Sequence, residues 1–132
     1  YGWEGEAMNC PSGHGSVAFG LANHATGDFA TVTGGRFNEA SGMASAVMGG
    51  RLNEVTGDSS AVIGGELNKA TGKYAAVLGG DSNEAAGWST AVTGGGSNKA
   101  NGSYSVVTGG QNNNANGEFT SVTGGVSNDA KG

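Results

Sequence analysis

Asparagine is the residue whose type and spacing most directly suggest a chemical role. One asparagine stands every 15 residues, at Asn23, Asn38, Asn53, Asn68, Asn83, Asn98, Asn113 and Asn128. Amide oxygens can bind cations, but Asn alone is a poor metal ligand and no Asp recurs beside these residues. An inward-facing Asn in each repeat would instead bond to its neighbour about 4.8 Å along the axis. We therefore predict a structural asparagine ladder and no metal site.

The other reactive side chains do not form a catalytic pattern. The chain has two histidines, His14 and His24, and one cysteine, Cys10. Acid–base or nucleophilic catalysis needs such groups brought together, and neither they nor the carboxylates recur in a convergent arrangement. A hexapeptide-repeat acyltransferase does not fit either, because 15 is not a multiple of six. We predict no enzymatic activity and no cofactor.

Two residues are candidates for covalent modification. Cys10 lies outside the repeats, and both a free thiol and an intermolecular disulfide remain open. Asn101-Gly102-Ser103 is the only Asn-x-Ser/Thr sequence in the chain. In a eukaryotic source it would place a glycan on an exposed corner.

The repeat itself predicts the elements that hold these residues. A β-branched run at residues 30–33 alternates around Val32 and indicates a strand, and Gly34-Gly35 then permits a sharp bend. Residues 37–41 form a second extended piece, after which Gly42 turns the chain back. Two short strands and two glycine corners per 15 residues predict an all-β fold, a β-solenoid of about eight coils. The repeats fill residues 16–132, and residues 1–15 are expected to be an N-terminal cap or linker.

Composition limits the function and the source of stability. The 132 residues include 28 glycines and carry a net charge of −5, with no basic patch, so we expect no nucleic-acid partner. The interior candidates are mostly Val, Ala, Ser and Thr, which bury little apolar area. Stability is therefore expected to come from hydrogen bonds between coils and from burial against other copies.

Particular repeats resemble a known family. Ser16-Val17-Ala18-Phe19-Gly20, followed by Ala25-Thr26-Gly27, resembles the Ser-Val-Ala-Ile-Gly-x-x-x-x-Ala-x-Gly repeat of the YadA-like heads of trimeric autotransporter adhesins. Later units, such as residues 105–117, resemble the Gly-Gly variant of that repeat, and the resemblance covers roughly residues 16–132. It implies a left-handed parallel β-roll, three chains packed side by side, and a role as an extracellular adhesin or spacer.

Variable outward positions are expected to carry the function. Two rows become apolar over the same middle coils, and we predict an interface between subunits at Phe37, Met48, Leu52, Ile63, Leu67 and Leu78. The alternative is that these side chains point inward and fill the interior. Aromatic residues after the closing glycines either stack on sugars or a partner chain, or are scattered singly over the surface.

These features favour an extracellular structural or adhesive repeat domain. We predict a self-associating, homotrimeric rod of a surface adhesin, located outside the cell or on its surface. Its expected partners are other copies of itself and a host matrix protein, glycan or other surface. An extracellular filament assembled by end-to-end stacking of solenoids is the alternative. Ice binding fits less well, because only Thr31-Val32-Thr33 supplies a full Thr-x-Thr motif and Met48, Ile63 and Leu78 interrupt the row.

Overall fold

The computed structural model describes residues 8–132 and shows a parallel β-solenoid of about eight coils of about 15 residues each. Within this range there is no helix, and the predicted all-β fold is confirmed. Each strand has two residues. The strands are β1 (Cys10–Pro11), β2 (Val17–Ala18), β3 (His24–Ala25), β4 (Thr31–Val32), β5 (Glu39–Ala40), β6 (Ala46–Val47), β7 (Glu54–Val55), β8 (Ala61–Val62), β9 (Lys69–Ala70), β10 (Ala76–Val77), β11 (Glu84–Ala85), β12 (Ala91–Val92), β13 (Lys99–Ala100), β14 (Val106–Val107), β15 (Asn114–Ala115), β16 (Ser121–Val122) and β17 (Asp129–Ala130).

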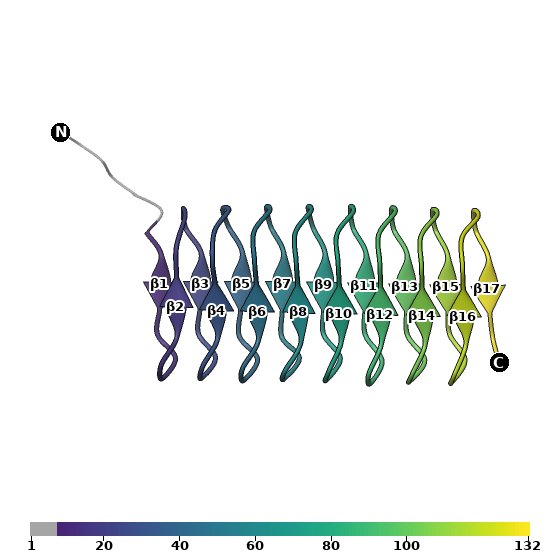
Figure 1. Cartoon of the computed structure of the whole chain (residues 1–132), viewed down its shortest axis with the longest axis horizontal. Helices are drawn as coiled ribbons and strands as arrows, with labels where there is room; N and C mark the ends of the chain where they lie inside the picture. The colour runs from purple at the N-terminus through teal and green to yellow at the C-terminus, as the bar shows by residue number, and fades with distance from the viewer. Residues whose placement is uncertain (1–7) are drawn as a thin grey trace.

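The strands form two parallel sheets along the rod (Figure 1). The odd-numbered strands make a nine-stranded sheet, here called sheet A, and the even-numbered strands make an eight-stranded sheet, sheet B. Each strand pairs with its equivalents in the coils on either side, so that Val47 lies opposite Val32 and Val62. Every coil therefore bonds only to its immediate neighbours, as in other repeat proteins.

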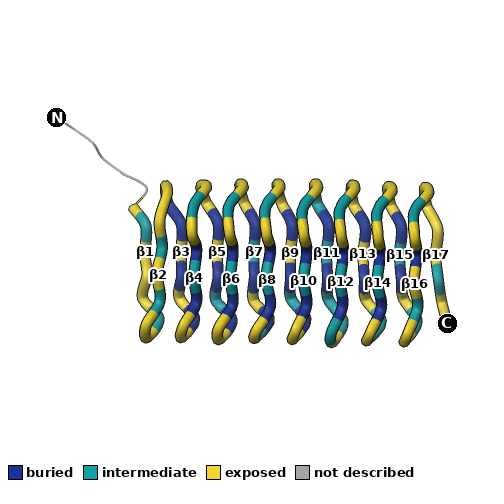
Figure 2. Tube along the Cα trace, viewed as in Figure 1, coloured by how far each residue is buried: buried dark blue, intermediate teal, exposed yellow. Residues whose placement is uncertain are grey.

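Small side chains fill the interior between the sheets. Val32, Val47 and the equivalent valines, together with Ala40 and the repeated asparagines from Asn23 to Asn113, are fully or almost fully buried, whereas Asn128 in the last coil is exposed. The largest fully buried side chains are Val and Asn, which leaves little apolar area per coil. Figure 2 shows buried residues along both sheets between the two ends of the rod, while much of each loop is exposed.

The first coil is one residue shorter than the others. Val17 pairs with Thr31, and Ala18 pairs with Val32, so Ala18 takes the inward valine position and Val17 is exposed. The single Gly20 stands where later coils have a Gly-Gly pair. The solenoid also begins earlier than residue 16, since β1 adds the first strand of sheet A. The predicted cap at residues 1–15 therefore includes part of the solenoid, and its first seven residues lie outside the described range.

Each coil reverses at two places, and non-glycine residues adopt positive φ at both. At the Gly-Gly corner these residues form the corner row: Ala22, Phe37, Leu52, Leu67, Ser82, Ser97, Asn112 and Ser127. At the second reversal, which we call the closing turn, they form the turn row: Phe29, Ala44, Ser59, Tyr74, Ser89, Tyr104 and Phe119. Their φ values lie between 53° and 59°, a left-handed conformation that is costly for side chains other than Gly and Asn.

Candidate functional site

The repeated asparagines hold the Gly-Gly corners together. Asn68 donates from Nδ2 to the carbonyls of Gly64 and Gly80, both at 2.9 Å, and its Oδ1 accepts the backbone N–H of Asn83 at 3.0 Å. The pattern differs from the predicted bonding between side-chain amides, because the partners are backbone groups. Among the ladder asparagines of the described residues, only Asn128 also donates from its amide to the Oδ1 of another ladder asparagine, Asn113, at 3.0 Å.

The structure adds one asparagine that the repeat spacing had missed. Oδ1 of Asn9 accepts the backbone N–H of Asn23 at 3.0 Å, and its Nδ2 donates to the carbonyl of Gly20 at 2.7 Å. Asn9 thus plays the same part in the first coil, 14 residues before Asn23. Because Oδ1 and Nδ2 of the ladder asparagines from Asn23 to Asn113 are already bonded to the chain, these groups have a structural role. The described residues contain no group of three or more His, Cys, Asp or Glu side chains placed to hold a metal ion.

The outer face of sheet A is charged. Glu39, Glu54, Lys69, Glu84 and Lys99 lie in register on consecutive strands. The Lys69 ammonium is 3.3 Å from a carboxylate oxygen of Glu54, and that of Lys99 is 3.4 Å from Glu84. These pairs are solvent-exposed and contribute little stability each. Sheet A is therefore a hydrated face that would be costly to bury.

The outer face of sheet B has the opposite character. Its outward positions, from β2 to β16, are Val17, Phe19, Thr31, Thr33, Ala46, Met48, Ala61, Ile63, Ala76, Leu78, Ala91, Thr93, Val106, Thr108, Ser121 and Thr123. No side chain among these positions is charged. The large apolar ones stay in solvent, with Met48, Ile63 and Leu78 exposed by 55%, 45% and 47%. A long uncharged and partly apolar face is typical of a surface that another molecule covers.

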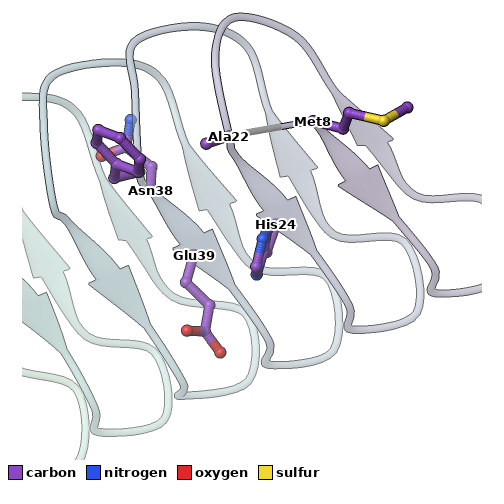
Figure 3. A pocket seen from close by; sticks show the side chains of 6 residues that line it. Met8, Ala22, His24, Asn38 and Glu39 are labelled. Carbon is purple, nitrogen blue, oxygen red and sulfur yellow. The ribbon is translucent and has the colours of Figure 1, made fainter. Parts of the chain in front are cut away.

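The six predicted interface residues do not form one strip. Met48, Ile63 and Leu78 follow strands of sheet B, whereas Phe37, Leu52 and Leu67 belong to the corner row. Phe37 lines a shallow hollow with His24 and Glu39 of sheet A, which Figure 3 shows from close by.

Leu67 occupies the equivalent place further along the rod, in a hollow lined by Lys69, Glu84 and Lys99. All six predicted residues are exposed, so none of them fills the interior. The corner row is itself uncharged, but Phe37 and Leu67 lie beside charged residues of sheet A. Of the predicted interface residues, only Met48, Ile63 and Leu78 therefore lie on a face that has no charged side chain.

The two candidate modification sites are both exposed. Asn101 lies directly after β13, and its Nδ2 donates to Oδ1 of Asn116 at 2.8 Å. Cys10 lies in β1 with an exposed side chain and forms no disulfide within the chain.

Cys10 is expected to react with a water-soluble thiol reagent without denaturant. An exposed thiol on a terminal strand needs no unfolding to meet the reagent. Ellman's reagent should release one equivalent of thionitrobenzoate per chain in native buffer. With the Cys10→Ser variant it should release none. A reaction that requires denaturant would show that another molecule or copy covers β1.

Among the described residues no helix is long and apolar enough to cross a membrane. No protein-family model matches this chain, and a search of curated proteins found no similar sequence.

Proposed function

We propose that this chain is a self-associating rod of an extracellular adhesin, in which three copies pack through the outer faces of their B sheets. The main support for this proposal is the contrast between the two faces, since sheet B has no charged outward side chain and sheet A has many. Interface cores are depleted of charge because desolvating an unpaired ion costs several kcal/mol. The resemblance to YadA-like heads supports three copies and an extracellular, adhesive role.

Burial of the outer face of sheet B would also supply buried apolar area, of which the single chain has little. In residues 8–132 the largest fully buried side chains are Val and Asn, so the hydrophobic contribution of one chain is small. Met48, Ile63 and Leu78 would add large apolar side chains to a shared interior between copies. Sheet A and its ion pairs would remain in water.

A charge placed on sheet B is expected to dissociate the assembly. By sedimentation velocity the unmodified chain should form discrete particles of three copies. Ile63→Glu should weaken the association by about 100-fold or more, because three like charges would be buried together. The side chain is already 45% exposed, so the solenoid itself should tolerate the change.

Leu67→Glu is the matched control for this experiment. Leu67 is 44% exposed and belongs to the same coil as Ile63, but it lies beyond the Gly-Gly corner, beside the charged residues of sheet A. The control should leave the three-copy particle intact. A stable monomer at all concentrations would refute the proposal, and polymers that lengthen with concentration would favour an end-to-end filament.

Adhesion itself needs a separate measurement. Beads coated with the chain should adhere to surfaces coated with matrix proteins such as collagen or fibronectin, and beads coated with albumin should not. If three-copy particles form but the beads do not adhere to either coating, the rod acts as a spacer and not as the adhesive element.

A further inference from the structure

Four exposed aromatic side chains form a continuous row along the closing turns. We call Tyr74, Trp88, Tyr104 and Phe119 the aromatic row. Their successive ring centroids are 5.9, 4.8 and 4.9 Å apart. The first two contacts are edge-to-face and the third is stacked. The aromatic residues in this part of the chain are therefore not scattered, although each ring is between 42% and 72% exposed.

Trp88 shows that the row is not a by-product of the 15-residue period. Tyr74, Tyr104 and Phe119 occupy the turn row, but the coil between the two tyrosines has Ser89 at that position. Trp88, the residue before it, supplies the ring and contacts both Tyr74 and Tyr104. The sequence departs from its repeat at the one place where the row would otherwise be interrupted.

The backbone gives no reason to place aromatic residues here. Tyr74, Tyr104 and Phe119 have φ of 59°, 56° and 58°, where Gly or Asn is the favourable choice. Other coils have Ala44 and Ser59 at the same position with the same backbone. These aromatic residues adopt an unfavourable backbone conformation and yet stay exposed. Such a combination indicates a binding role.

The uncharged centre of the row indicates the kind of ligand. Between Lys73, whose ammonium is 5.3 Å from the Tyr74 ring, and Glu118, the closing turns contribute Trp88, Ser89, Ser103 and Tyr104. None of these is charged, and the chain as a whole carries −5, which disfavours polyanions. The ring surfaces that remain exposed offer apolar contact, and the serine and tyrosine hydroxyls offer hydrogen bonds beside them.

We propose that the aromatic row binds a neutral, extended polysaccharide of linked hexopyranoses. Pyranose rings have apolar C–H faces that pack on aromatic rings and hydroxyl edges that need polar partners. Neighbouring coils are about 4.8 Å apart, which is close to the length of one sugar unit in an extended chain. The closing turns lie at the edge of the rod opposite the Gly-Gly corners (lower edge in Figure 1), so sheet B stays available for other copies.

The test uses Trp88 as its own reporter. The chain has two tryptophans, so the full-length Trp3→Phe variant leaves Trp88 as the only one. Its fluorescence should change saturably on titration with cellohexaose, chitohexaose or mannohexaose. Cellobiose, which can cover only part of the row, should bind at least about tenfold more weakly than the hexasaccharide that binds best.

Tyr104→Ser in the same background should weaken hexasaccharide binding by about tenfold or more, since it removes the ring between Trp88 and Phe119. Serine already occupies this backbone conformation at Ser59 and Ser89, and an unchanged thermal melt will show that the variant folds. Phe29→Ser is the matched control: Phe29 belongs to the turn row and is 59% exposed, but its ring contacts His14 and not the aromatic row.

Three outcomes would overturn the proposal. One is no fluorescence change with any of the three hexasaccharides at millimolar concentration. The second is equal weakening by Tyr104→Ser and Phe29→Ser. The third is a fluorescence change that depends on protein concentration alone and that Tyr104→Ser abolishes, which would assign the row to contact between copies. None of these outcomes depends on Ile63→Glu, so the sheet B proposal stands or falls separately.

Discussion

Gly65→Ala is expected to destabilise the solenoid by roughly 3–5 kcal/mol. Gly65 has φ of 84°, and an added Cβ would lie 2.2 Å from the carbonyl oxygen of Gly80 and 2.5 Å from Nδ2 of Asn68. Both contacts are held by the hydrogen bonds of the Gly-Gly corner, so relief would require two coils to separate. Urea denaturation followed by circular dichroism would measure the loss.

Gly64→Ala is the natural control, because the two glycines are adjacent and only one is required by the packing. A Cβ on Gly64 would meet nothing within 4 Å. Its φ is not positive, so alanine should be neutral or slightly stabilising. Equal destabilisation by the two substitutions would contradict this account of the corner.

Asn68→Ala is expected to cost roughly 3–4 kcal/mol of unfolding free energy. The substitution would leave the buried N–H of Asn83 without its acceptor and would remove one donor each from the carbonyls of Gly64 and Gly80. Buried backbone groups without a partner lose their full hydration energy, which is the reason for the size of the effect. Thermal and urea denaturation would give the difference.

Asn114→Ala serves as the comparison, because Asn114 is a half-buried residue of β15. Its side chain makes no hydrogen bond in the described structure, so the change should stay within about 0.5 kcal/mol. If the two variants lose similar stability, the repeated asparagines are not the element that joins the coils.

The period of the sequence was sufficient to predict the coil. Val32, Val47 and Val62 recur at one position of a β-branched run, and strand alternation then places residues 30 and 32 inward and 31 and 33 outward. For the second strand, alternation alone did not show which face points inward. Asn38 and Ala40 recur regularly along the chain while their neighbours vary, which favoured the Asn and Ala face, and the structure buries that face. A repeated interior is visible in sequence because every coil must satisfy the same neighbours.

The surface was harder to predict, because it depends on how the corners are shaped. Met48 and Leu52 are four residues apart, and nothing in the spacing shows that the Gly-Gly corner separates them onto sheet B and the sheet A side. The sequence left open whether the aromatic residues act together or are scattered singly, because Trp88 is one position out of register and joins the row only through the shape of the closing turn. Asn9 was missed because the first coil is one residue short.

The hydrogen bonds of this solenoid join only adjacent coils, and this arrangement has a genetic consequence. A recombination or replication slip that removes 15 codons subtracts one whole coil, and one that duplicates 15 codons adds one. In both cases the remaining coils pair with their neighbours as before. The 14-residue first coil, with Gly20 in place of a pair, shows where a single-codon loss can also be absorbed. The length of the rod is therefore a heritable quantity that can change in steps of one coil.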